Sequence, residues 1–355
     1  MPGLIYCAVL RFCIGFAETE PPVSGRSGKV YQLAENAVLE VEDSAQEFAQ
    51  RTPKQIAWMR FRRNKVGVVS AWVAIFFVLA AILAPVIVRV LGLSNVDTYP
   101  DALNEYAMPI GKFGGISLDH PLGVEPGAGR DVLSLLLYGS RISYTVAVIT
   151  SVTSIGLGML IGIATGYFRG RVDAIVGRFS DFLLSFPGTF MIIALSLPLT
   201  QRVEALGIAK DNAARIVVLV VFFVFFGWPG FARLIRSQAM SMRERDFVMA
   251  AQAMGASSWR IITKELLPNL WPTAIVFLSL SLPGFLSAEA VFSFLGVGVQ
   301  APASTFGLVL ADAVGYWRDD PAYLLIPSTM LVIIVLSLNL LGDAIRDALD
   351  PKGSR

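Results

Sequence analysis

The sequence predicts an all-α polytopic membrane protein with six transmembrane helices. Of its 355 residues, 55% are hydrophobic and 16% are charged, and the mean hydropathy is +0.63. This composition is too apolar for the surface of an ordinary soluble protein. Uncharged runs of about 17 residues or more recur along the chain, and about 20 helical residues are enough to cross the hydrocarbon core. A helix also satisfies its own backbone polar groups in lipid, so each run predicts one spanning helix.

Six such runs occur along the chain. They are Val66 to Val88, Ile142 to Phe168, Phe182 to Gln201, Ile216 to Ala232, a segment centred near 273 to 296, and Ala322 to Gly342. The fifth span lies in an apolar region from Leu266 to Ala311 that only Glu289 interrupts, and a loop rich in Pro, Ala and Gly is expected to follow it. The fourth span contains Pro229, which predicts a kink near its inner end.

Lys and Arg residues are distributed unequally between alternate loops. Segments 51–65, 169–178, 233–264 and 343–355 carry six, three, six and three basic residues, whereas segments 89–141, 201–215 and 289–321 carry four, three and one. Basic residues are enriched in cytoplasmic loops. The first set of segments, and with it both termini, is therefore predicted to be cytoplasmic.

The predicted spans and loops divide the chain into five parts. They are a mobile acidic tail over 1–50, a basic segment with the first span over 51–93, an extracytoplasmic loop over 94–139, a core of five spans over 140–345, and a cytoplasmic tail over 346–355. The core includes a cytoplasmic loop over 236–270. Cys7 and Cys13 fall in the acidic tail without metal-site spacing or histidine partners, so no zinc or redox role is expected for them.

The residues do not form an enzymatic constellation. One histidine excludes most His-based metal sites and catalytic triads, and no G-x-x-x-x-G-K-[ST] run is present to hold nucleotide phosphates. Basic residues are dispersed over loops near the membrane, which disfavours nucleic-acid binding. The chain is expected to have no catalytic residues, no metal site and no cofactor of its own. If it uses ATP, another chain must bind the nucleotide.

The cytoplasmic loop contains the stretch DFVMAAQAMGASSWRIITKELLPNL, which has helical periodicity. Apolar side chains at three- and four-residue spacing, among alanines that favour helix, predict a short helix from Asp246 to Met254. The residues expected to share one face of it are Phe247, Ala250, Ala251 and Met254. Small residues at positions 250, 251, 253 and 256 would let a partner surface approach the backbone closely.

A second short helix is predicted to follow a glycine turn. Gly255 tolerates the positive φ at which the first helix must stop. Ser257 or Ser258 can cap the next helix, and Pro268 with Pro272 is expected to limit its regular continuation into the fifth span. The apolar face of this second helix would be formed by Trp259, Ile262 and Leu266.

This loop resembles the EAA loop of ABC importer permeases. That pattern is Glu-Ala-Ala, a Gly after three more residues, and a Leu-Pro whose proline lies thirteen residues beyond the Gly. The matching residues are Ala250, Ala251, Gly255, Leu267 and Pro268. Met249 stands in place of the family's Glu, and Glu265 replaces an apolar residue of the pattern. In this family the loop couples the permease to an ATPase subunit. Apolar shape and the Gly255 turn, more than a charged contact, are therefore expected to carry that coupling here.

Other segments narrow the resemblance to the peptide and nickel group of these importers, and within it to the C-type permease subunit. The segments are WMRFRRNKVGVVSAWVAIFFVLAAILAPVI, HPLGVEPGAGRDVLSLLLYGSRIS, GYFRGRVDAIVGRFSDFLLSFPGTFMIIAL, EAVFSFLGVGVQAPASTFGLVLADA and LNLLGDAIRDALDPK. They follow the family's order and cover most of residues 55–352. The resemblance implies the ABC type I importer permease fold.

The resemblance also implies partners and a role for the loop. The chain would form half of a heterodimeric pathway for peptides in the bacterial inner membrane, with a second permease, two ATPase subunits that hold ATP and Mg²⁺, and an extracytoplasmic substrate-binding protein. Nickel, opines or oligosaccharides are alternative cargoes. The first loop helix would be a coupling helix that moves with one ATPase. Residues expected to take part in coupling are Asp246, Phe247, Ala250, Ala251, Met254, Gly255, Leu267 and Pro268.

Polar residues outside the loop are weaker candidates. Glu289 could line the pathway or contact the other permease, but internal hydrogen bonding or subunit packing is favoured over a direct substrate role. His120, Arg130 and Asp131, in a Gly- and Pro-rich outer loop, predict a turn or a docking surface for the binding protein rather than a metal site. Close helix packing in lipid is predicted for glycines 156, 158, 162 and 166 of the second span.

The competing class of protein is a secondary transporter driven by an ion gradient. Such a protein would need a relay of intramembrane acidic or histidine residues, or paired broken helices in inverted repeats. Only Glu289 lies plainly within a predicted span, and no inverted repeat is evident. A membrane scaffold without transport would not explain the geometry of the cytoplasmic loop.

Overall fold

The computed structural model describes residues 52–350. The chain forms two compact units, residues 1–60 and 61–355. Helix α3 (Pro53–Arg63) begins in the first unit and ends in the second. The acidic tail predicted over 1–50, with Cys7 and Cys13, lies outside the described residues.

Five helices of the described chain are long and apolar enough to cross a membrane, and a bent pair of helices raises the number to six. The five are α4 (Lys65–Ile82), α6 (Val132–Phe168), α9 (Asp211–Arg243), the continuous helix Ser258–Phe294, and α14 (Pro321–Leu349). The bent pair is α7 (Gly170–Ser185) and α8 (Gly188–Ala205). The prediction of an all-α protein with six spans is confirmed when this pair is counted as one span.

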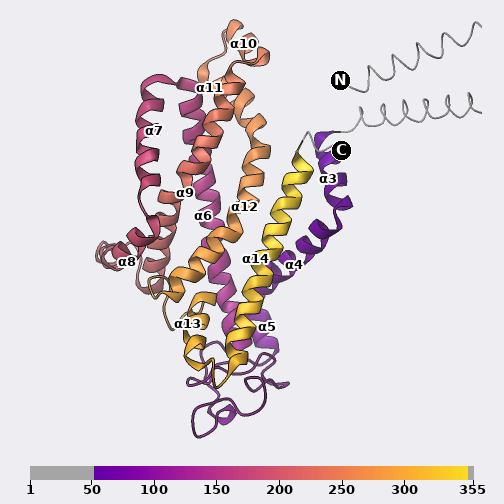
Figure 1. Cartoon of the computed structure of the whole chain (residues 1–355), viewed down its shortest axis with the longest axis vertical. Helices are drawn as coiled ribbons and strands as arrows, with labels where there is room; N and C mark the ends of the chain where they lie inside the picture. Colours follow the sequence, from indigo (N-terminus) through magenta and orange to yellow (C-terminus); the bar gives the residue numbers. More distant parts are fainter. Residues whose placement is uncertain (1–51, 351–355) are drawn as a thin grey trace, which may run out of the picture. The chain divides into compact units, whose positions relative to one another are not determined.

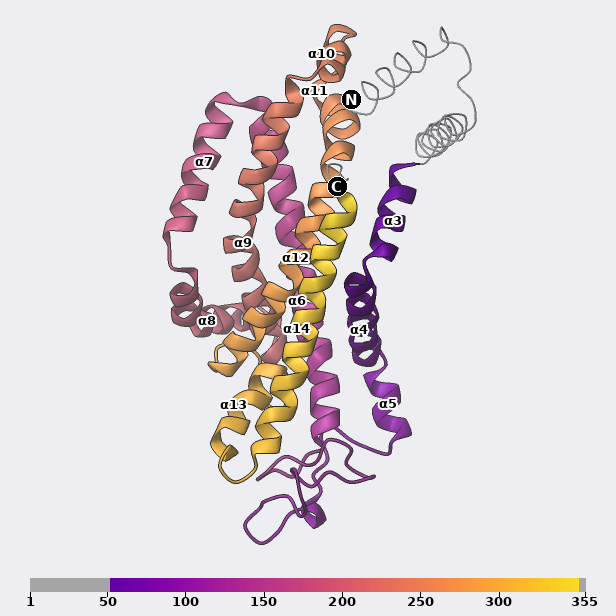
Figure 2. The same cartoon turned by 45° about the vertical axis from the view of Figure 1, so that its right-hand side comes forward.

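The long helices of the second unit pack side by side, with α6 against α9 and α12 (Leu267–Phe294) against both α6 and α14 (Figures 1 and 2). Helix α4 packs on α14, and α5 (Ala84–Val90) packs on α6. At one end of this bundle lies α10 (Asp246–Ala253); we call this the α10 end. At the other end, here the loop end, lie the connection over 94–131 and α13 (Phe306–Tyr316).

The third predicted span, Phe182 to Gln201, differs from the expectation of one straight helix. Helix α7 stops at Ser185, and α8 starts at Gly188 after a bend of 86°. Phe186 has extended backbone, with φ −82° and ψ 137°, because the ring of Pro187 disfavours helical geometry in the preceding residue. Apolar composition identified the span but not this change of direction.

The boundaries of α6 and α9 also differ from the predicted ones. Helix α6 starts ten residues before the predicted Ile142, because the Asp131 side chain accepts a hydrogen bond of 2.7 Å from the Ser134 backbone N–H and caps the helix. Helix α9 runs on past Pro229 to Arg243, well beyond the predicted end at Ala232.

Helices α6 and α9 approach each other along a stripe of glycines. A Cβ atom added at Gly158, Gly162 or Gly166 would lie 2.9, 2.6 and 2.7 Å from backbone carbonyl oxygens of α9. Those oxygens belong to residues at four-residue spacing, Trp228, Ala232 and Arg236. The predicted packing role is therefore confirmed for these three glycines. Gly156, the fourth of the set, is exposed and has no atom within 4 Å of such a Cβ.

Replacing Gly162 by alanine should destabilise the protein, although alanine is normally the better helix former by about 1 kcal/mol. The new methyl group would overlap the Ala232 carbonyl and the Ile235 side chain, so we expect the free energy of unfolding to fall by about 1 to 3 kcal/mol. Thermal unfolding of the purified protein in detergent measures the change. Gly156→Ala, in the same helix, is the matched control and should be neutral or stabilising. Equal effects of the two substitutions would contradict close packing at Gly162.

Candidate functional site

The loop between α9 and α12 folds into a helical hairpin at the α10 end. Helix α10 stops where Gly255 adopts a φ of +80°. The Gly255 N–H donates to the Gln252 carbonyl at 2.9 Å, and the Ala256 N–H donates to the Ala251 carbonyl at 3.0 Å. These two bonds form a Schellman motif, which satisfies carbonyls at the end of a helix. The predicted glycine stop is thus confirmed.

The second arm of the hairpin continues into α12 without interruption. Helix α11 (Ser258–Ile261) is capped by the Ser257 hydroxyl, which accepts from the Arg260 N–H at 3.4 Å. A π-helical turn over Ile262–Leu266 then joins α11 to α12. The helix thus continues past Pro268, but not regularly, in agreement with the predicted limit to its regular continuation. Proline removes one backbone donor, and the wider π turn just before it lets the helix continue with a changed register.

The inner face of the hairpin belongs to the core of the helix bundle. Val248 of α10 is fully buried and Ala251 is 7% exposed. Both join one apolar cluster with Ile261, Leu266 and residues of α6, α9 and α12. Ile261 and Leu266 are five residues apart, the spacing of the π turn, so the predicted face of Trp259, Ile262 and Leu266 is corrected. Val248 and Ala251 therefore join α10 to the core formed by α6, α9 and α12.

The outer face of the hairpin carries several exposed apolar side chains. Met254 and Trp259 are 82% and 74% exposed, and Phe247, Met249 and Ala250 are exposed as well. The predicted set of α10 residues is therefore divided, because Ala251 packs inside the chain whereas Phe247, Ala250 and Met254 face outward. Sequence reasoning missed Val248, although its spacing of three from Ala251 could have identified it.

A small cavity lies at the tip of the hairpin. It has a volume of about 210 Å³, and its lining residues are Ala251, Met254, Gly255, Ala256, Arg260, Ile261 and Glu265. Glu265, which departs from the EAA pattern, is thus part of the cavity wall. Of the other predicted coupling residues, Asp246 is exposed in the first turn of α10, Leu267 is half-buried against the core, and Pro268 is exposed.

Polar contacts hold the base of the hairpin to α6. The Arg169 guanidinium at the end of α6 pairs with Glu244 at 2.6 Å, immediately before α10. From the last turn of α9, Arg243 donates to the Tyr167 carbonyl at 2.8 Å. The pairs are partly exposed and contribute modestly to stability. They fix the point at which the chain leaves α9.

Glu289 lies within α12 and is fully buried. Its carboxylate accepts a hydrogen bond from the Ser143 hydroxyl of α6 and another, of 2.7 Å, from the Ser293 hydroxyl one turn further along α12. Buried carboxylates require such donors in a medium without water. The contacts agree with the expected internal hydrogen bonding, and a contact of Glu289 with the pathway or the other permease stays a prediction.

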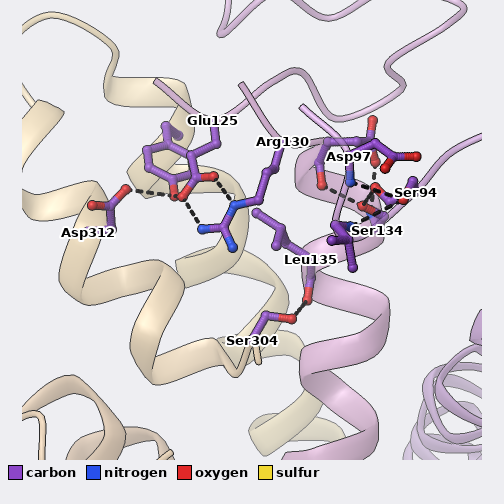
Figure 3. Close-up of polar contacts among 11 residues, drawn as sticks. Ser94, Asp97, Glu125, Arg130, Ser134, Leu135, Ser304 and Asp312 are labelled. Atoms are coloured by element: carbon purple, nitrogen blue, oxygen red, sulfur yellow. Dashed lines mark hydrogen bonds and ion pairs between the residues drawn. The ribbon is translucent and has the colours of Figure 1, made fainter. Parts of the chain in front are cut away.

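The residues predicted for docking at the loop end bond to their own chain. His120 Nδ1 lies 3.0 Å from Asp131 Oδ2, and Asp131 is fully buried as the cap of α6. Arg130 pairs with both carboxylate oxygens of Glu125, which is itself buried (Figure 3). These contacts shape the loop. Docking at His120, Arg130 and Asp131 stays a prediction, and within residues 52–350 no group of three or more His, Cys, Asp or Glu side chains could hold a metal ion.

Removing the Glu289 carboxylate should lower stability. Glu289→Ala leaves the Ser143 and Ser293 hydroxyls without their acceptor, which should cost about 1 to 3 kcal/mol in thermal unfolding measurements. Glu289→Gln keeps an acceptor oxygen and should remain close to the unsubstituted protein in both stability and transport. A raised KM for one cargo in Glu289→Gln, at unchanged stability, would instead show a direct cargo contact.

The chain resembles known transport proteins over most of its length. Residues 158–355 match the family described as binding-protein-dependent transport system inner membrane component, and residues 52–105 match the N-terminal TM domain of oligopeptide transport permease C. The dipeptide transport system permease protein DppC of Alkalihalophilus pseudofirmus is 31% identical over 85% of this chain and 90% of its own length. The glutathione transport system permease protein GsiD of Pectobacterium atrosepticum is 32% identical over 85% of this chain and 92% of its own length. The oligopeptide transport system permease protein OppC of Mycobacterium bovis is 34% identical over 86% of this chain and 96% of its own length. The chain therefore belongs to the inner membrane components of binding-protein-dependent transport systems, the permease subunits of ABC importers.

Proposed function

We propose that this chain is one of two different permease subunits that together form the pathway of a peptide importer. The α10 hairpin carries the proposal, because its inner face is continuous with the core of the spans while its outer face is apolar and exposed. An apolar surface of this kind at the end of a membrane protein fits a protein partner. In the proposed assembly that partner is one of two ATPase subunits, which hold ATP and Mg²⁺.

The proposed mechanism follows from the two faces of the hairpin. An ATPase that seats Phe247, Ala250 and Met254 in a groove would carry α10 with it as the two ATPases close around nucleotide. Val248 and Ala251 would transmit the displacement to α6, α9 and α12 through the shared core. A ligand shifts a conformational equilibrium only by its difference in affinity for the two states. The groove must therefore hold α10 firmly while the spans tilt.

The proposed orientation places the α10 end in the cytoplasm with both termini. The excess of Lys and Arg in the segments predicted to be inside supports it. The loop end would then face the extracytoplasmic side, where a substrate-binding protein delivers the cargo. The residues available for docking include exposed side chains of the loop such as Tyr106, Phe113 and Leu118.

Peptides are the proposed cargo. The three relatives are named for the transport of dipeptides, glutathione and oligopeptides, all of which contain peptide bonds. The test is ATP-dependent uptake into proteoliposomes that contain the complete importer, with labelled dipeptides and longer peptides. Saturable peptide uptake that requires the binding protein is the expected result. Uptake of Ni²⁺, opines or oligosaccharides without peptide uptake would contradict the proposal.

Placing a charge on the outer face of α10 should uncouple the importer. Met254→Asp puts a carboxylate into the proposed apolar contact, where burying an unpaired charge is costly, so we expect at least a tenfold loss of ATPase affinity, or about 1.4 kcal/mol. The measurements are co-purification of the ATPases and transport-coupled ATP hydrolysis. Gln252→Asp adds the same charge to an exposed position on another side of α10 and should leave both intact. Normal coupling in Met254→Asp would exclude this face as the contact.

The Gly255 turn should matter through its backbone conformation alone. No atom lies within 4 Å of a Cβ at this position, so a substitution meets no steric obstacle beyond its own φ of +80°. Gly255→Val should therefore reorient the hairpin and abolish coupling, while Gly255→Asn, which tolerates the left-handed region, should retain most of it. Membrane insertion and thermal stability should stay close to normal in both. Equal coupling in the two variants would show that the turn does not position α10.

A further inference from the structure

Four side chains from three parts of the chain meet at the loop end, and we call them the loop-end cluster: Glu125, Arg130, Asp312 and Tyr323. Arg130 Nε and Nη2 donate to the two oxygens of Glu125 at 2.6 and 2.8 Å, a bidentate pair (Figure 3). Such pairs are among the stronger hydrogen-bonded contacts in proteins. Glu125 and Arg130 belong to the connection over 94–131, Asp312 belongs to α13, and Tyr323 belongs to α14.

Tyr323 stands between two carboxyl groups. Its hydroxyl oxygen lies 3.1 Å from Glu125 Oε1 and 3.1 Å from Asp312 Oδ2. A phenol has one proton to donate, so it can donate to only one of them at a time. Both contacts are hydrogen bonds only when the other carboxyl group carries a proton and donates it to the tyrosine oxygen.

Asp312 is the member of the pair that fits the protonated form. Arg130 engages both oxygens of Glu125, whereas the hydrogen-bonding neighbours of the Asp312 carboxyl group are the Tyr323 hydroxyl and Glu125 itself. Partial desolvation of the carboxyl group first, and the nearby Glu125 charge second, raise the pKa of Asp312 above its ordinary value, although the residue as a whole is exposed. Tyr323 and the Arg130 charge act in the opposite direction and do not cancel this effect.

The surroundings of Asp312 leave it open to solvent protons. A cavity of about 360 Å³ is lined by Asp312, Glu125 and Arg130 together with small and apolar side chains, among them Leu135 of α6. The titratable and charged groups that act on Asp312 are Glu125 and Arg130 from the loop and Tyr323 from α14, and the Tyr323 ring in turn contacts Tyr316 of α13. Helix α6 contributes the apolar Leu135, and no charged group, to the lining of this cavity. Protons can therefore exchange with water while the cluster stays assembled.

We propose that Asp312 and Tyr323 form a proton-operated latch that fastens the 94–131 loop to α13 and α14. In the closed latch the Asp312 carboxyl O–H donates to the Tyr323 oxygen, the Tyr323 O–H donates to Glu125, and Glu125 is held by Arg130. When Asp312 releases its proton to water, the Tyr323 proton serves one carboxylate and the other faces a lone pair. One of the hydrogen bonds that link Asp312, Tyr323 and Glu125 is then lost, and two negative charges face each other across the phenol.

The sign of the pH dependence follows from the raised pKa. A carboxyl group with a higher pKa in the closed state than in the open state binds its proton more tightly when closed. The latch is therefore fully stabilised below the ordinary pKa of an aspartic acid and loses this contribution as the pH rises through the raised value. In the orientation proposed above, the latch responds to extracytoplasmic pH, so acidification outside would hold the loop in place. Only the assignment of the latch to the extracytoplasmic side of the membrane rests on the proposed function.

Hydrogen exchange of the 94–131 segment tests the latch in the complete importer reconstituted in nanodiscs. After correction for the intrinsic pH dependence of exchange, the opening constant of this segment should rise with pH by up to tenfold per pH unit, the limit for one proton. Asp312→Asn is permanently neutral and can still donate to the Tyr323 oxygen, so the segment should stay protected at every pH. Tyr323→Phe removes the bridge and should leave the segment open at every pH.

Asp319→Asn is the matched control, because Asp319 is an exposed carboxyl group near the end of α13 that lies outside the cluster. It should retain the full pH dependence. The α10 hairpin, at the other end of the bundle, is an internal reference and should show none. A pH-independent segment in the unsubstituted protein, or an unchanged pH slope in Asp312→Asn, would overturn the proposal. If Tyr323→Phe does not fold, the pH dependence of the opening constant in Asp312→Asn is sufficient to test the proposal. The readout does not involve cargo, so a failure here is distinct from a failure of the peptide-import proposal.

Discussion

The close approach of α6 and α9 is the contact on which the rest of this permease depends. Three glycines allow the α6 backbone to lie against carbonyl groups of α9, and side chains of any size at these positions would separate the two helices. In lipid there is no hydrophobic drive between apolar helices, so such close packing carries much of the association. Helix α9 in turn leads directly into α10, and the pair of Arg169 with Glu244 holds that junction to the end of α6. The position of the hairpin is thus set by the spacing of these two helices.

Polar groups inside the bundle are placed where they reinforce helix contacts. Glu289 joins α12 to α6 through Ser143, and Gln238 of α9 accepts from the Thr273 hydroxyl of α12 at 3.0 Å. An unsatisfied carboxylate in this medium would be costly, so its donors fix the rotation of both helices about their axes. Helix α12 is therefore held on both neighbours by specific contacts as well as by apolar packing. A displacement that reaches α12 moves it as a unit.

Much of this architecture follows from local sequence, and the exceptions have a physical cause. The structure contains the apolar spans, the helix stop at Gly255 and the glycine stripe of α6 that the sequence predicts. Each of these depends on single residues or on helical periodicity. The outward face of α10 was only partly predictable, because Ala251 is buried by residues of α6, α9 and α12 that are remote in sequence. The bend at Pro187 has a local signal in the Phe-Pro dipeptide, but the apolar run around it hides the change of direction. Glu125 and Tyr323 are 198 residues apart, so no local pattern could bring them together.

The two ends of the permease are connected by one continuous helical element. The helix from Ser258 to Phe294 has 37 residues and, at 1.5 Å per residue, extends for about 55 Å from the hairpin to the loop end. A short connection then leads into α13, which carries Asp312. The π turn at 262–266 has a hydrogen-bond pattern different from that of an α-helix, and it lies beside the hairpin. In the proposed mechanism, bending concentrated there would adjust α10 to its ATPase partner, while the remainder of α12 would move α13 and its contacts with the loop. The proposed latch at Asp312 would then act on this motion from the opposite side of the membrane.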